Sequence, residues 1–175
     1  MKGYKGYIDL QTYQSPCGEM LIGTIGEKLC LCDWAKSSHR EATDKRMERF
    51  FNAKIREGGS SVGASVARQL DEYFCGKRTK FDIPMALVGT DFQKIVWESL
   101  LAIPYGKTIS YKEQARSIDR PKAVRAVASA NALNPVAIIV PCHRVIGSSG
   151  KLTGYAGGLA AKRFLLDLES GRHLI

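Results

Sequence analysis

The sequence predicts a chain of two parts with different fold classes. We expect an α/β (α+β) part with an antiparallel sheet over residues 1–85, and a mostly helical part with a helix-turn-helix over residues 86–175. Short apolar runs bounded by turn residues fill the first third, and such runs are typical of strands. Two capping boxes, each a hydroxyl residue three positions before a glutamate or glutamine, mark helix starts in the second part.

The strands of the first part follow one another closely. Residues 7–10 predict a short strand, and residues 15–18 predict the turn after it. Residues 20–25 and 29–34 then pair as a hairpin, because the glycine and glutamate at 26–27 suit a tight reversal of the chain. An antiparallel sheet is therefore the expected centre of this part.

Two helices are expected after these strands. Residues 41–55 predict a charged helix with one apolar stripe, and residues 62–74 predict a second helix that stops at Gly76. Residues 81–84 form an edge strand or an extended linker. No pattern in residues 1–85 identifies chemistry, so we interpret this part as structural, with an unrecognised binding role as the alternative.

The starts of helices in the second part can be recognised directly from the sequence. Thr90 and Gln93 form one capping box, and Ser110 and Glu113 form another at the start of a helix over residues 111–118. A tight turn at Asp119 and Arg120 follows, with Pro121 in the position that suits the first residue of the next helix.

Residues 111–118 and 122–133 together predict a helix-turn-helix whose second helix is the recognition helix. Arg125 is the one long cation of that second helix past its first turn. Its other positions are mostly small: Ala123, Ala126, Ala128, Ser129, Ala130 and Ala132. A thin helix can approach the narrow minor groove of DNA, whereas a bulky one suits the major groove. The alternative is that the alanines only allow close packing of helices.

The most informative stretch is residues 137–146. Four apolar residues at 137–140 predict a buried strand, and Pro141 ends it because proline has no N–H for a ladder. Cys142, His143 and Arg144 follow directly. Segments at strand ends often hold reactive groups, so the placement suits a nucleophile. The alternative is a buried cysteine beside a histidine, and a nucleophile would still need a third group to orient the imidazole.

Charge favours a polyanionic partner. The chain carries a net charge of +9, and its second part is the more basic. Residues 1–85 hold 14 Lys and Arg against 11 Asp and Glu, whereas residues 86–175 hold 12 against 6. DNA or RNA is the first partner to consider, and a merely solvated basic surface is the alternative. No apolar run has the length of a membrane span, and the start of the sequence lacks a signal-peptide core, so we expect no membrane and a cytoplasmic protein.

The cysteines do not form a recognisable framework. There are five of them, an odd number in a chain expected to be cytoplasmic, which argues against structural disulfides. Cys30 and Cys32 alternate with leucines in a predicted strand and are expected in the core. No pair has the spacing of metal ligands, so we predict no metal and no cofactor.

A family resemblance rests on these same residues. The segments that carry it are Asn134-Pro135, Pro141-Cys142-His143-Arg144-Val145, Gly154-Tyr155 and Gly157-Gly158-Leu159. They strongly resemble the O6-alkylguanine-DNA alkyltransferases, densely from about residue 90 to 171 and loosely before. The related alkyltransferase-like proteins carry tryptophan at the cysteine position, which is Cys142 here. Ala137, Asn131 and Leu133 depart from residues that some members carry, which affects the expected pocket wall and DNA contacts and leaves the nucleophile untouched.

The resemblance implies a fold and an activity. Residues 1–85 would be a ribonuclease-H-like structural domain, and residues 86–175 a winged-helix-like DNA-binding and alkyl-transfer domain. The activity would be DNA repair by direct reversal: a single-turnover transfer of a methyl or alkyl group from O6-alkylguanine in duplex DNA to Cys142, with O4-alkylthymine as a second substrate. The protein would act as a monomer on double-stranded DNA, in contact with the minor groove, without a cofactor. Some members bind zinc in the first domain, but matching ligands are not recognisable here.

The resemblance also implies the catalytic roles. Cys142 would be the nucleophile, His143 its base acting through a water, and Glu169 the carboxylate that orients the imidazole. A soft thiolate suits attack on an alkyl carbon, and the departing guanine needs a hydrogen-bond donor. Tyr111 would be that donor, and Asn134 would tie the recognition helix to the cysteine turn.

Further residues would bind the substrate. The implied pocket residues are Val145, Tyr155, Ala156 and Lys162, with Lys162 also assisting Tyr111. The implied DNA-binding residues are Arg125, Ala123 and Ala126, where Arg125 fills the space left by a nucleotide turned out of the duplex. Arg144 would be a structural hydrogen-bonding hub.

Two other functions stay open at this point. A lesion-sensing DNA-binding protein without transfer, like the alkyltransferase-like proteins, would share the fold, but the cysteine at position 142 argues against it. A cysteine hydrolase acting on a small substrate would use Cys142 and His143, but the helix-turn-helix and the basic second part argue against that.

Overall fold

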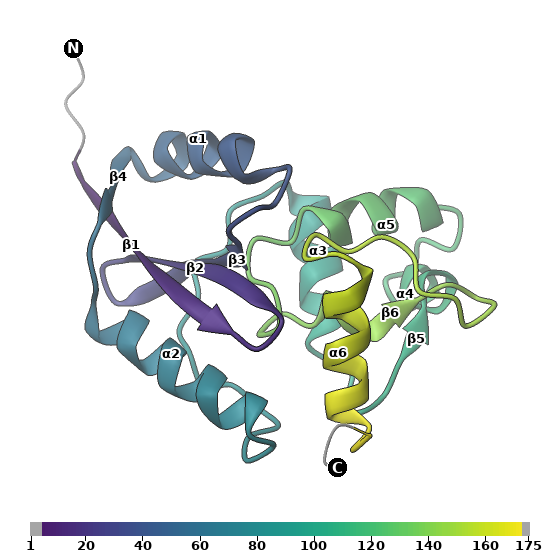
Figure 1. The fold of residues 1–175 in the computed structure, drawn as a ribbon. Helices are drawn as coiled ribbons and strands as arrows, with labels where there is room; N and C mark the ends of the chain where they lie inside the picture. The colour runs from purple at the N-terminus through teal and green to yellow at the C-terminus, as the bar shows by residue number, and fades with distance from the viewer. Residues whose placement is uncertain (1–4, 173–175) are drawn as a thin grey trace. The chain divides into compact units, whose positions relative to one another are not determined.

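The computed structural model of the chain describes residues 5–172 (Figure 1). Within it the chain forms two compact units, Met1–Val88 and Gly89–Ile175, and each is described by itself below.

The first unit is built on a four-stranded sheet with the strand order β3-β2-β1-β4. As predicted, β2 (Gly18–Ile25) pairs antiparallel with both β1 (Gly6–Ser15) and β3 (Lys28–Trp34), and tight turns join the three strands. β1 continues beyond the predicted 7–10 segment, because its polar residues 11–15 also pair with β2.

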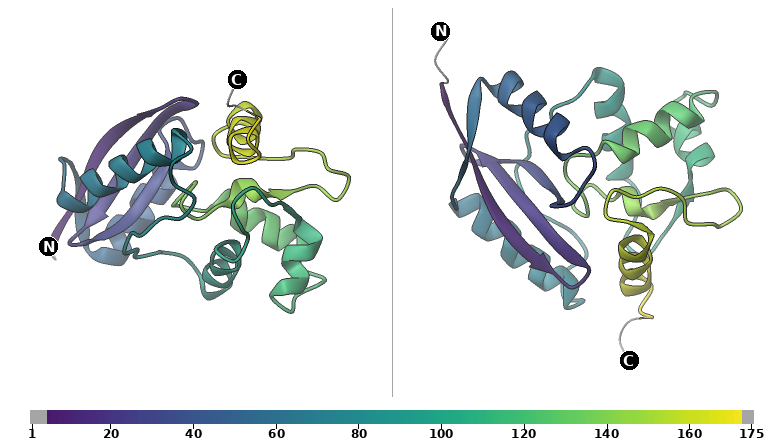
Figure 2. Two further views of the ribbon diagram at one scale, coloured as in Figure 1. Left: turned by 90° about the horizontal axis from the view of Figure 1, so that it is seen from below. Right: turned by 45° about the horizontal axis from the view of Figure 1, so that its top comes forward.

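Two helices cover opposite faces of this sheet (Figures 1 and 2). They are α1 (Arg40–Phe51) and α2 (Ser61–Phe74). Met47 of α1 belongs to the same buried cluster as Ile8 of β1. Tyr13 of β1 instead donates a hydrogen bond of 2.7 Å to Asp71 of α2. Ile8 and Tyr13 are an odd number of positions apart, so their side chains point to opposite faces of the strand.

The strand β4 (Ala53–Glu57) corrects one prediction, a helix over residues 41–55, and it adds a parallel strand to the predicted antiparallel sheet. Helix α1 ends at Phe51, and Asn52 adopts φ 48°, a left-handed conformation that commonly terminates helices. The chain then pairs with β1 in parallel. Ile55, whose apolar character suggested a helical stripe, instead lies two residues after the buried Ala53 and on the same face of the strand.

The second unit is mostly helical, as predicted. Its helices are α3 (Asp91–Leu100), α4 (Tyr111–Ser117), α5 (Val124–Ala132) and α6 (Leu159–Glu169), with the short 3₁₀ helix η1 (Cys142–Arg144). The strands β5 (Ile109–Ser110) and β6 (Val145–Ile146) pair in parallel. Both predicted capping boxes are present, at Thr90 with Gln93 and at Ser110 with Glu113. Helices α4 and α5 pack against each other, as a helix-turn-helix requires.

The start of α5 differs from the sequence prediction, in which Pro121 opened the helix. Asp119 has φ 56°, and the amide of Ala123 donates to the carbonyl of Arg120 in a turn. The tight connection therefore extends through Ala123, and α5 begins only at Val124.

Residues 137–140 are buried, as predicted, but they do not form a strand. The amide of Val140 donates to the carbonyl of Val136 at 3.0 Å, and Ile138 between them has φ 69°. The side chain of Asn134 accepts from the amide of Val136 and donates to the carbonyl of Val140. It thus bonds two backbone groups that would otherwise need other partners. Apolar content predicted the burial, whereas the backbone path depends on one amide side chain.

Candidate active site

The Cys142-His143-Arg144 cluster forms η1 and is buried, with exposed fractions of 8%, 0% and 7% in that order. The Asn134 side chain holds the carbonyl of Val140 at 2.8 Å, and the amide of Cys142 donates to that same carbonyl at 2.9 Å. The thiol is therefore carried by a turn that is tied to the end of α5.

His143 meets Glu169, the last residue of α6, through a buried hydrogen bond of 2.7 Å between Nε2 and Oε1. The other ring nitrogen, Nδ1, is buried and has no protein hydrogen-bond partner among residues 5–172. An ionised carboxylate only accepts, so hydrogen-bond logic assigns the proton to Nε2. Nδ1 then carries the lone pair of a base.

Glu169 is kept ionised by its donors. Arg144 donates from Nε to Oε2 at 2.9 Å and from Nη2 to Oε1 at 3.0 Å. Burial raises the pKa of Glu169, but hydrogen bonds from His143 and Arg144 and their charges outweigh it and hold that pKa at about 2. Burial lowers the pKa of His143, with Glu169 opposing the shift. A neutral imidazole beside a lasting carboxylate can take a proton and be stabilised as a cation.

Backbone groups that sequence reasoning missed complete this network. The carbonyl of Ile103 accepts from Nη1 of Arg144 at 2.6 Å, and the amide of Gly106 donates to Oε2 of Glu169 at 3.2 Å. Gly106 has φ 75°, and a Cβ there would lie 2.9 Å from the carbonyl oxygen of Glu169. The only sequence signal was the Pro104-Tyr105-Gly106 segment, whose turn character predicts a helix end and not a hydrogen bond.

Lys162 of α6 forms a second buried centre. It is fully buried, and its Nζ donates to the carbonyls of Val145 at 2.7 Å and Thr153 at 3.0 Å. Nζ also lies 3.5 Å from the hydroxyl of Tyr111, which donates to the Thr153 carbonyl at 3.3 Å. One ammonium thus joins α6, β6, the first residue of α4 and the loop at 147–158.

The electrostatics of this centre connect it to Cys142. Burial lowers the pKa of Lys162 to about 8, and the charge of Cys142 partly opposes that change. Burial also raises the pKa of Tyr111, and the charge of Cys142 raises it further. A thiolate at Cys142 would therefore raise the pKa of both Lys162 and Tyr111.

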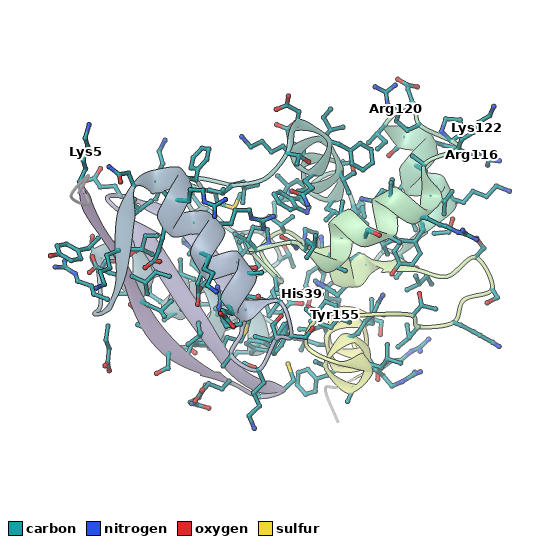
Figure 3. The ribbon with its side chains drawn as sticks, turned by 90° about the horizontal axis from the view of Figure 1, so that it is seen from above. Lys5, His39, Arg116, Arg120, Lys122 and Tyr155 are labelled. Carbon is teal, nitrogen blue, oxygen red and sulfur yellow. The ribbon has the colours of Figure 1, made fainter. Side chains whose placement is uncertain are left out.

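The other two expected pocket residues, Tyr155 and Ala156, lie in the loop that leads to α6, and both are half-buried. The amide of Gly158 donates to the carbonyl of Tyr155 at 2.9 Å, which closes the turn before α6. Figure 3 labels Tyr155 beside that helix.

The three expected DNA-binding residues lie on α5 and at its start. Arg125 and Ala126 are exposed, and Ala123 is half-buried. The opposite face of the helix packs inward through Val127 and Ala130, and the indole of Trp97 donates to the Ala130 carbonyl at 2.8 Å. Small residues thus occur on both faces of α5, so close packing accounts for Ala130 and leaves Ala126 unexplained.

Within residues 5–172, no group of three or more His, Cys, Asp and Glu side chains is placed to hold a metal ion. Over the same range, every helix is too short or too polar to span a bilayer.

Comparison with known proteins gives matches to both units. Residues 91–171 match the 6-O-methylguanine DNA methyltransferase, DNA binding domain, and residues 8–87 match the ribonuclease-like domain of the same proteins. A methylated-DNA–protein-cysteine methyltransferase of Methanosarcina barkeri is 64% identical over 166 residues, which cover 93% of this chain and 96% of the relative.

Solved structures agree. An O6-methylguanine methyltransferase of Mycobacterium tuberculosis superposes with a TM-score of 0.80 at 44% identity, covering 94% of each chain. A structure of the Mycobacterium tuberculosis protein in complex with DNA gives a TM-score of 0.79 at 43% identity, covering 95% of this chain and 94% of the other. With both domains matched and this degree of identity, the chain belongs to the methylated-DNA–protein-cysteine methyltransferase family.

Proposed function

We propose that this protein repairs DNA by direct reversal, taking one methyl or alkyl group from O6-alkylguanine in a duplex onto the sulfur of Cys142. O4-alkylthymine is a second substrate. The observation that carries the proposal is the buried Glu169–His143 pair next to Cys142. Nδ1 of His143 in this pair has no protein hydrogen-bond partner among the described residues. Residues 86–175 form the DNA-binding and transfer domain, and residues 1–85 have a structural role.

The chemistry needs only groups of this chain and a water. His143 takes the thiol proton through that water, and Glu169 stabilises the imidazolium that results. A sulfur–carbon bond forms as the carbon–oxygen bond breaks, and its electron pair stays on the guanine. The departing guanine takes a proton from the Tyr111 hydroxyl, and the imidazolium and phenolate then neutralise through solvent.

The products are S-alkylcysteine and guanine. The thioether offers no route back to the thiol, so each chain reacts once. Lys162, whose Nζ lies 3.5 Å from the Tyr111 hydroxyl, would stabilise the phenolate. Because all of these groups come from one chain, the proposed active form is a monomer.

The helix-turn-helix would hold the duplex. The exposed Ala126 gives α5 a thin outer edge that suits the minor groove, with Arg125 beside it to enter the base stack. Arg116, Arg120 and Lys122 lie exposed at the connection between α4 and α5, where they can contact phosphates (Figure 3). This arrangement favours sequence-independent, salt-sensitive binding. The location that we propose is the cytoplasm.

Lesion sensing without transfer is the alternative, and the residue at position 142 argues against it. Cys142 is a thiol next to the hydrogen-bonded His143–Glu169 pair, whereas a sensor needs no nucleophile. The names of the relatives, methylated-DNA–protein-cysteine methyltransferases, also favour transfer.

Mass spectrometry after mixing with an O6-methylguanine duplex tests the proposal. We expect one added methyl group per chain, on the peptide that contains Cys142, and no further reaction when substrate is in excess. The Cys142→Ser variant should gain nothing yet bind the duplex within a few-fold of wild type, because a hydroxyl is barely ionised at neutral pH. Binding with no mass change would favour the sensor, and repeated turnover without an adduct would favour a hydrolase.

A further inference from the structure

Two buried amide side chains join the helices of the helix-turn-helix. Gln114 of α4 is fully buried, and Asn131 of α5 is 6% exposed. Nδ2 of Asn131 donates to Oε1 of Gln114 at 2.7 Å, and Nε2 of Gln114 lies 3.3 Å from Oδ1 of Asn131. The two amides therefore bond each other in both directions.

The pair is also anchored to α3. Nε2 of Gln114 donates to the hydroxyl of Ser99 at 3.0 Å and lies 3.3 Å from the carbonyl of Val96. The Ser99 hydroxyl donates in turn to that carbonyl at 2.6 Å. Three helices thus meet at one buried polar cluster inside the second unit.

The position of this cluster relates it to the proposed chemistry. Helix α4 begins at Tyr111, the proposed proton donor, and α5 carries Arg125, the proposed stack-filling residue. Three residues after Asn131, Asn134 holds the turn that carries Cys142. An error in the angle between α4 and α5 would therefore move Arg125 relative to Tyr111 and the thiol.

We propose that Gln114 and Asn131 are a positioning pair that sets the angle of α5 on α4, so that a bound duplex presents its flipped base to Cys142. The inference rests on the proposed function, which it extends to two residues that touch neither DNA nor the reacting atoms. Hydrogen bonds are directional, whereas apolar contacts are not, so leucines of similar size would fill the space without fixing the angle. A free alkylated base needs no helix to present it, so its reaction does not depend on the pair.

The test compares transfer from an O6-methylguanine duplex with transfer from free O6-methylguanine. Single Gln114→Leu and Asn131→Leu variants leave one amide buried without its partner and should melt earlier. The double leucine variant should regain most of the melting temperature. Its ratio of duplex rate to free-base rate should nevertheless stay roughly tenfold below wild type, because small misplacements are costly in rate. The reciprocal pair, Gln114→Asn with Asn131→Gln, should restore the ratio.

A matched control lies in the first unit. Gln69 is also a buried amide, bonded to the backbone of Asp82, and Gln69→Leu should lower the melting temperature while leaving the ratio unchanged. If the double leucine variant recovers both stability and the ratio, the pair is only structural and the proposal is wrong. Affinity for unmodified duplex supplies a readout independent of transfer: the double leucine variant should bind roughly tenfold more weakly than wild type, because it loses the preorganisation of its binding surface. Equal affinity would overturn the inference even if no transfer occurred.

Discussion

Asp33 in the first unit and Glu169 in the second are buried carboxyl groups with an arginine nearby, yet their pKa values move in opposite directions. Burial raises the pKa of Asp33 to about 6, and the Trp34 amide and Arg40 only partly oppose it. Burial acts on Glu169 in the same sense, but its pKa lies at about 2.

The difference lies in the hydrogen-bond donors. Asp33 accepts from the amide of Trp34 at 2.8 Å, and the nearest approach of Arg40 is 3.7 Å, too long for a hydrogen bond. Arg40 instead bonds Asp44. Glu169 accepts from His143, twice from Arg144, and from the Gly106 amide. Donor number and geometry, more than burial, thus decide whether a buried carboxyl group stays charged.

The largest expected effect tests whether the charge of Glu169 matters to the chemistry. Glu169→Gln keeps the shape but cannot stabilise an imidazolium, so we expect the transfer rate to fall by about 10²- to 10⁴-fold. Asp33→Asn is the matched control and should leave the rate unchanged. The single-turnover transfer rate of each variant tests this expectation. A Glu169→Gln protein that reacts as fast as wild type would exclude the Glu169–His143 pair from the mechanism.

Removing Arg144 and removing Arg40 should lower the free energy of unfolding by different amounts. Arg144→Met leaves a buried carboxylate and should lower the free energy of unfolding by about 3–5 kcal/mol. Arg40→Met should cost about 1 kcal/mol near pH 5, because Asp33 can then take up a proton and needs no cation. Urea unfolding of both variants at pH 5 and pH 7 measures this contrast. Equal losses at the two sites would contradict it.

Stability should depend on pH with opposite signs at the two carboxyl groups. The pKa of Glu169 lies below its ordinary value of 4.5, so its stabilisation is present above that pH and is lost as pH falls toward 2, by about 3 kcal/mol. The pKa of Asp33 lies above its ordinary value of 3.8, so its contribution is complete below that pH and is lost as pH rises through about 6. Unfolding free energies of wild type, Glu169→Gln and Asp33→Asn from pH 3 to pH 8 separate the two slopes.

The smallest effect concerns Asp33 alone at neutral pH. Because its ionised form is disfavoured there, Asp33→Asn should raise the free energy of unfolding at pH 7 by about 1 kcal/mol and lower it slightly at pH 4. Thermal melts at the two pH values check the change of sign. A loss of stability at both would mean that Arg40 stabilises the Asp33 carboxylate more than the geometry indicates.

The sequence predicted those parts of the fold whose causes are local. Thr90 and Ser110 predict the starts of their helices because the hydrogen bonds of an N-cap form within one helical turn. Asn52 and Ile138 were not predicted, because each adopts a positive φ within a segment of suitable helical or strand composition. The backbone path through Ile138 also depends on the hydrogen bonds of Asn134, which the composition of residues 137–140 does not reveal.

The site was predictable to a similar degree. Cys142, His143 and Arg144 are adjacent and stand out by themselves, but Glu169 lies 26 positions from His143 and alone predicts a solvated helix end. Only the family resemblance suggested its role. The backbone donor at Gly106 and the acceptor at Ile103 carry no side-chain signal. The Gln114–Asn131 pair, 17 positions apart, becomes visible only once α4 and α5 are packed.

Helix α6 carries both Lys162 and Glu169, seven positions apart, which places them on one face two turns from each other. That spacing limits the kinds of mutation that the segment between them can tolerate. Residues between them that face outward, such as Arg163, can be exchanged freely. An insertion or deletion of a single codon in this interval would instead rotate Glu169 by about 100° relative to Lys162. No side-chain replacement could restore both contacts, so the number of residues between Lys162 and Glu169 is more strongly constrained than the identity of most of them.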